Sequence, residues 1–83
     1  MPKLVIEVLS KATEDRDLGI KLDVYERCGV EEYWIVDINK REIIVYSQNV
    51  NGNFKYRFIY GLDNELVWNC KAIKLLEIFK GLM

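Results

Sequence analysis

The sequence predicts an α/β domain with a mixed β-sheet of four or five strands, a crossover helix between the first two strands and a short C-terminal helix. Three observations predict this fold. Apolar runs rich in β-branched and aromatic residues occur at 3–9 and 31–37, which is typical of strands covered on both faces. The intervening residues 10–30 are numerous enough for a right-handed crossover between parallel strands. The later apolar runs are joined by short turns, which favours antiparallel pairing.

The crossover segment has the pattern of an amphipathic helix that begins at residue 13 or 14 and ends at Cys28. Leu18, Leu22 and Tyr25 are spaced by four and three residues, so they lie on one side of such a helix. Gly29 follows directly and is suited to the C-terminal cap, where a left-handed backbone conformation is common. The sequence therefore predicts a helix whose apolar side packs on the sheet.

The second half of the sequence predicts short strands joined by short turns, followed by a helix. Asn51 and Gly52 form a pair that favours a tight hairpin turn. Lys55 and Arg57 alternate with aromatic residues, a pattern that suits phosphate contacts but is also typical of a solvated sheet face. Strands are expected at residues 31–37, 43–48, 54–60 and, more briefly, 65–68, and the C-terminal helix at 72–82.

Length and composition predict one soluble, cytoplasmic domain over residues 1–83. A formal charge of −1 gives no basic excess of the kind that nucleic-acid-binding domains usually carry. The absence of histidine excludes histidine bases and most zinc sites. Cys28 and Cys70 are expected to stay reduced, although a disulfide is also compatible with the sequence. No apolar run approaches the length of a membrane span.

Glu7 stands in the middle of the first apolar run, where an unpaired carboxylate is costly. One interpretation places this strand at the edge of the sheet, with Glu7 facing solvent or a lysine. Another makes Glu7 a functional acid that is kept charged by a cation. A lysine on the crossover helix has a stem long enough to reach it.

The order of several short pieces resembles the Uma family of restriction-endonuclease-like proteins, which is grouped with the PD-(D/E)XK nuclease fold. The pieces are Pro2, Glu7-Val8-Leu9-Ser10, Asp17, Lys21-Leu22, Tyr25, Gly29-Val30, Glu32-Tyr33-Trp34, Val36-Asp37 and the closing "LLEIF". The resemblance covers nearly the whole chain and matches the C-terminal half of the family's members. It implies a truncated restriction-endonuclease-like core.

The resemblance further implies a metal-dependent endonuclease acting on DNA. Glu7 would be the acid of the (D/E)XK strand and a ligand of Mg²⁺, a hard cation that prefers oxygen ligands. The motif's usual lysine position is occupied by Leu9, and Lys21 matches a lysine displaced to the helix. Asp17 lies four residues before Lys21, so the two are also compatible with an ordinary surface ion pair. Tyr25 and Trp34 are interpreted as core residues rather than as stacking platforms for bases.

The chain departs from the family where a second acid is expected. Pro2-Lys3 stands in place of a Pro-Asp pair, and the strand that would supply the other acid is absent. We therefore expect weak Mg²⁺ binding and an active site that is catalytically incomplete in one chain. The exposed strand edge favours a homodimer or higher oligomer. An alternative partner is the missing half of the family's fold, encoded upstream. The alternative function is a non-catalytic oligomeric or protein-interaction module.

Overall fold

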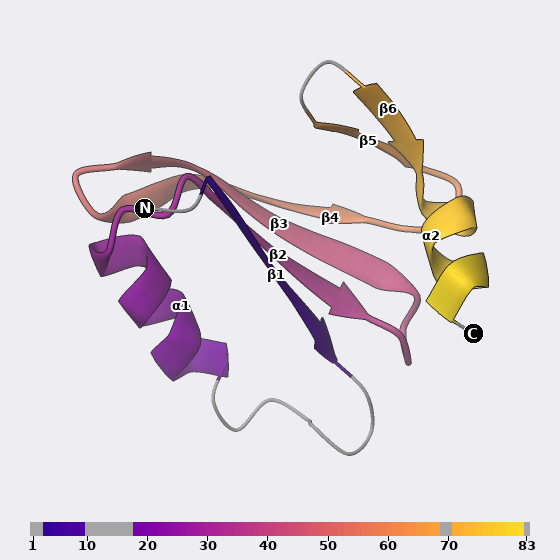
Figure 1. The fold of residues 1–83 in the computed structure, drawn as a ribbon, viewed down its shortest axis with the longest axis horizontal. Coiled ribbons are helices and arrows are strands. Elements are labelled where there is room, and N and C mark those ends of the chain that lie inside the picture. Colours follow the sequence, from indigo (N-terminus) through magenta and orange to yellow (C-terminus); the bar gives the residue numbers. More distant parts are fainter. Residues whose placement is uncertain (1–2, 10–17, 69–70, 83) are drawn as a thin grey trace.

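A computed structural model of the chain describes residues 3–9, 18–68 and 71–82. Its main feature is a four-stranded sheet with the strand order β1-β2-β3-β4 (Figure 1). β1 and β2 are parallel, and the other neighbouring strands are antiparallel. The predicted mixed sheet is confirmed, with strands β1 (Leu4–Leu9), β2 (Glu32–Asp37), β3 (Glu42–Val50) and β4 (Asn53–Tyr60).

The helix α1 (Leu18–Arg27) connects β1 to β2 (Figure 1). Gly29 follows it with a φ of 82°, a conformation that a residue without a Cβ adopts at little cost. The Gly29 amide donates to the Glu26 carbonyl at 3.2 Å and the Val30 amide to the Tyr25 carbonyl at 3.1 Å. This pair of bonds is the Schellman arrangement that closes many helices, so the predicted glycine cap is confirmed. The expected beginning of the helix, at residue 13 or 14, lies outside the described residues.

The sheet has two faces with different coverings, because side chains alternate along each strand. We call one the α1 face; Tyr33 lies on it, and its ring meets that of Tyr25 from α1 with 4.9 Å between the centroids. Residue pairing places Glu7 of β1 on the same face. The other, which we call the core face, carries Trp34 and Val36, both 4% exposed.

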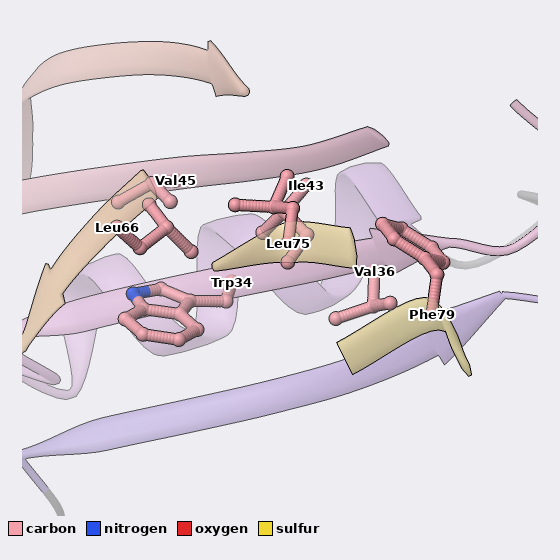
Figure 2. Close-up of a cluster of buried hydrophobic side chains, with 7 residues drawn as sticks. All are labelled: Trp34, Val36, Ile43, Val45, Leu66, Leu75 and Phe79. Carbon is pink, nitrogen blue, oxygen red and sulfur yellow. The ribbon is translucent and has the colours of Figure 1, made fainter. Parts of the chain in front are cut away.

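The core face is covered by the C-terminal part of the chain. This part comprises the two-stranded sheet of β5 (Glu65–Trp68) and β6 (Lys71–Lys74), followed by the helix α2 (Leu75–Leu82). Figure 2 shows the side chains of α2 and β5 against those of β2 and β3. The buried cluster consists of Trp34, Val36, Ile43, Val45, Leu66, Leu75 and Phe79. Burial of this apolar surface is the main source of the domain's stability.

The predicted C-terminal helix is correct in type but wrong in its beginning. Residues 71–74 form β6, so the helix begins at Leu75 rather than at residue 72. Ile73 pairs with Leu66 of β5. The Leu75 amide then donates to the Asn64 carbonyl at 3.3 Å, which joins the end of β6 to the start of the hairpin. Pairing with the neighbouring strand β5 thus overrides the local helical pattern. The short strand predicted at 65–68 belongs to this separate sheet.

The hairpin between β3 and β4 turns at the predicted pair. Asn51 has a φ of 54° and Gly52 a φ of 82°. Two consecutive positive values in a two-residue loop are the signature of a type I′ turn, whose twist matches that of the flanking strands.

β1 is an edge strand, which corrects the expectation that it is covered on both faces. On the core face, Ile6 is 50% and Val8 46% exposed. The run of apolar residues suggested complete burial, but β2 is its only strand neighbour among the described residues. The edge position left open in the sequence analysis is the one observed. In the described part of the chain, no helix is long and apolar enough to cross a membrane.

Candidate active site

Glu7 lies in the middle of β1 and points towards α1. Its Cα partner in the parallel ladder is Ile35 of β2. The Glu7 side chain is 26% exposed, so it is partly screened from water without being enclosed. A carboxylate at such a depth needs a partner to stay charged at low cost.

Two side chains from α1 provide those partners, both at Oε1 of Glu7. Lys21 Nζ lies 3.3 Å from this oxygen, and the Tyr25 hydroxyl donates to it at 3.1 Å. Residues four apart on a helix lie one turn above each other on one side, which is why Lys21 and Tyr25 reach the same atom. The contact expected between the lysine of the crossover helix and Glu7 is present, while the catalytic roles of the two residues remain predictions.

The Lys21–Glu7 pair is open to solvent on the lysine side. The Lys21 side chain is 44% exposed. Partly exposed pairs of this kind contribute about 0.2–1 kcal/mol, because water and salt screen the attraction. The pair therefore fixes the position of the carboxylate more than it stabilises the fold. It also leaves the lysine ammonium accessible to an anion from outside.

Tyrosine rings pack against one another beside this carboxylate. Tyr25 meets Tyr33 edge to face, and Tyr33 stacks on Tyr46 with 6.1 Å between the ring centroids. Tyr33 is completely buried, and its hydroxyl has no hydrogen-bond partner among the described residues. A buried hydroxyl without a partner is costly, because it gives up its hydrogen bonds to water without replacing them.

The surroundings keep these tyrosine hydroxyls protonated. Burial, followed by the hydrogen bond to Glu7 and the charge of that carboxylate, raises the pKa of Tyr25 above its usual value, while the charge of Lys21 acts in the opposite direction. Burial also raises the pKa of Tyr33, and Coulomb interactions with Glu7, Tyr25 and Tyr46 add to the effect. Tyr25 is therefore a hydrogen-bond donor to Glu7 throughout the neutral range.

The described residues do not provide a complete metal site. They contain no group of three or more acidic, histidine or cysteine side chains that could hold an ion. The register places Asp37 on the same face as Glu7, opposite Leu9. Oδ1 of Asp37 accepts the Lys40 amide at 3.0 Å and so caps the turn after β2. A single carboxylate shared with a lysine and a tyrosine does not by itself fit Mg²⁺, which requires several oxygen ligands.

The remaining residues named in the sequence analysis lie either away from the contacts of Glu7 or outside the described residues. Asp17 lies outside the described residues. Lys55 and Arg57 are exposed; the Lys55 ammonium lies over the Tyr56 ring and the Arg57 guanidinium over the Tyr46 ring. Cys28 is a free, exposed thiol, and Cys70 lies outside the described residues.

Tyr25 is the participant that sequence reasoning missed, because its place in an apolar stripe indicated a core residue. It does pack on Tyr33, but its hydroxyl also donates to Glu7. The four-residue spacing between Lys21 and Tyr25 was a signal that could have found it. Trp34, by contrast, is a core residue as predicted; its indole nitrogen donates to Glu32 Oε1 at 3.0 Å.

The α/β fold thus places an acid of one strand opposite a lysine of the crossover helix. A family model, Uma2, described as "Putative restriction endonuclease", matches residues 1–75. The chain belongs to this family. The resemblance identified from the sequence is thereby confirmed.

A solved structure has a similar fold. It is a protein from Anabaena variabilis ATCC 29413 described as "a putative nuclease belonging to DUF820". The TM-score is 0.78 at 15% sequence identity, and the match covers 99% of this chain and 46% of that one. This chain thus spans less than half the length of that protein. No curated protein matches the chain.

Proposed function

We propose that this domain acts on DNA phosphodiesters as part of a metal-dependent endonuclease centre, to which it contributes Glu7 and Lys21, and that the centre is incomplete in a single chain. The observation that carries the proposal is the 3.3 Å contact between Glu7 Oε1 and Lys21 Nζ. It joins an acid and a lysine that lie 14 residues apart in sequence, on separate elements. Family membership supports the same class of reaction.

The two residues have complementary chemistry for phosphodiester hydrolysis. A divalent ion would neutralise the charge that develops on the phosphate, and Glu7 is the carboxylate available to bind it. The Lys21 ammonium is suited to bind a phosphate oxygen or to orient a water molecule, and its 44% exposure keeps it accessible. Tyr25 holds Glu7 in place by donating a hydrogen bond to Oε1. We assign no step to a metal in the single chain, because one carboxylate does not make a site for it.

DNA binding tests the substrate class. We expect a fluorescent DNA duplex to bind with an affinity that falls as salt rises, because phosphate contacts release counterions. Lys21→Met should weaken this binding several-fold, whereas Lys80→Met, at an exposed position of α2 on the opposite side of the sheet, should leave it unchanged. Equal affinities for the wild type and Lys21→Met would contradict the assignment of Lys21.

Plasmid nicking with Mg²⁺ or Mn²⁺ tests the role of Glu7. At dilutions where the protein is monomeric, we expect no nicking above that of Glu7→Gln. Any nicking that occurs at higher concentration, or after addition of an upstream-encoded half, should disappear in Glu7→Gln and persist in the exposed-acid control Glu31→Gln. Nicking that survives in Glu7→Gln would remove Glu7 from the centre.

The second candidate function is a non-catalytic oligomeric or protein-interaction module. The exposed apolar side chains of Ile6 and Val8 on the edge strand favour it. Self-association without salt-dependent DNA binding would support this alternative over the nuclease centre.

A further inference from the structure

The outer edge of β1 has a defined set of unpaired backbone groups. The carbonyls of Lys3 and Leu9 accept the amides of Glu32 and Ile38 at 2.9 and 3.3 Å. Successive residues of a strand direct their backbone groups to opposite sides, so the odd-numbered residues of β1 face β2. The amides and carbonyls of the even-numbered residues between them therefore face outwards. No strand pairs with this edge in the described part of the chain.

The side chains along this edge are apolar on the core face, whereas on the α1 face they include Glu7. Ile6 and Val8 lie on the core face, 50% and 46% exposed. Glu7 lies between them on the α1 face, held by Lys21 and Tyr25. An edge with free backbone groups and exposed apolar side chains is a template for another strand.

We propose that the occupant of this edge is β1 of a second copy of the chain, paired antiparallel about a two-fold axis at Ile6. The edge is self-complementary in this register, since Ile6 meets its own copy and Leu4 meets Val8 of the other chain. All the outward backbone groups of these residues then find partners. On the core face, the exposed Ile6 and Val8 side chains cover one another.

This pairing also completes the acid set, and here the inference rests on the proposed function. In the same register Glu7 lies opposite Val5 of the other chain, so the two copies of Glu7 occupy diagonal positions on the α1 face. Diagonal residues have Cα atoms about 7–8 Å apart, near enough for two glutamate side chains to reach one ion. The described residues of a single chain place no second carboxylate beside Glu7, and the identical chain supplies one, which gives a divalent cation oxygen ligands from two strands.

Molecular mass in solution gives the first test. The wild type is expected to elute with about twice the 9.8 kDa of one chain at micromolar concentration, measured by light scattering. Ile6→Lys should be monomeric, because it places a charge at the centre of the pairing. Val50→Lys is the matched control: Val50 is 53% exposed, lies on β3 and should leave the dimer intact. A monomeric wild type would overturn the proposal and leave the edge to a different polypeptide.

A cross-link tests the register and does not depend on whether Ile6→Lys folds. Cα atoms of a hydrogen-bonded antiparallel pair are about 5.5 Å apart, within the range that a disulfide spans. With Cys28 and Cys70 both replaced by serine, Ile6→Cys should form a disulfide-linked dimer under mild oxidation. Val50→Cys in the same background should remain monomeric on a non-reducing gel. A dimer in which position 6 does not cross-link would show that another surface is used.

Metal binding separates this inference from the proposed function. Electron paramagnetic resonance should detect one bound Mn²⁺ per two chains, and Mn²⁺ should tighten the dimer. Glu7→Gln should abolish both effects while leaving the metal-free dimer unchanged. A dimer with no Glu7-dependent Mn²⁺ site would overturn the shared centre although the interface stands. Mn²⁺ binding that Asp37→Asn abolishes in the monomeric Ile6→Lys would place the ion within one chain and overturn it as well.

Discussion

The two faces of the sheet follow different physical rules. The core face buries a closed apolar cluster in which Ile43, Leu75 and Phe79 are completely buried. The α1 face instead combines the completely buried Tyr33 with a carboxylate, an ammonium and further tyrosine rings at intermediate depth. Burial of apolar surface on the core face stabilises the folded state. On the α1 face, holding polar groups partly away from water costs some free energy of folding. The buried apolar cluster and the polar groups around Glu7 thus lie on opposite faces of one sheet.

The largest loss of stability should follow removal of a large side chain from the core face. Phe79→Ala is expected to destabilise the domain by about 3–5 kcal/mol, because it leaves a cavity beside Val36 and Ile43. Urea unfolding followed by circular dichroism measures the change. Leu76→Ala, at a position 46% exposed on the same helix, should cost far less. Similar losses for the two variants would mean that α2 does not pack as described.

High pH should weaken the α1 face selectively. The pKa values of Tyr25 and Tyr33 are raised in the folded state, chiefly by burial. Their contribution to stability is therefore complete below the usual tyrosine pKa of 10.0 and is lost as the pH rises through the folded values. We expect the free energy of unfolding to fall above that pH. Tyr33→Phe should make the fall shallower, and an unchanged pH profile in this variant would contradict the environment described for Tyr33.

Removing single hydroxyls should have opposite effects at two adjacent tyrosines. Tyr33→Phe deletes a buried hydroxyl that has no partner in the described residues and is expected to stabilise the domain by up to about 1 kcal/mol. Tyr25→Phe deletes a donor to Glu7 and should cost about 1 kcal/mol. Chemical denaturation at neutral pH compares them. A strongly destabilised Tyr33→Phe would reveal a hydrogen bond to that hydroxyl.

The smallest effect is expected at the ion pair. A double-mutant cycle of Glu7→Gln and Lys21→Met should give a coupling energy of about 0.2–1 kcal/mol, because the pair is partly exposed. Added salt should reduce the coupling further. The cycle of Asp23→Asn and Arg27→Met, a more exposed pair four residues apart on α1, is the reference and should give no more than this. A coupling energy of several kcal/mol would mean that the Glu7 pair stabilises the domain as much as a buried core side chain does, and it would contradict the description of the pair as partly exposed.

Much of the architecture followed from local signals. The type I′ turn at Asn51-Gly52 and the cap at Gly29 were predictable because both need positive φ, which few residues adopt cheaply. The contact between Lys21 and Glu7 followed from a resemblance that spans separate elements. Tyr25 was assigned to the core alone, because the pattern of apolar spacing does not say where a hydroxyl points. The C-terminal helix begins three residues later than predicted, because residues 71–74 pair with β5 as the strand β6.

The sequence by itself determined most of the elements, the parallel crossover and the presence of an acid in an apolar strand, since these depend on periodicity and backbone preference within short segments. Only the tertiary structure decided that β1 lies at an edge, that Lys21 and Tyr25 share one oxygen of Glu7, and that residues 71–74 form a strand. The first two features arise from contacts between segments far apart in the chain, whereas β6 pairs with the strand that directly precedes it. Their free energy depends on which surfaces meet, and no local pattern encodes that choice.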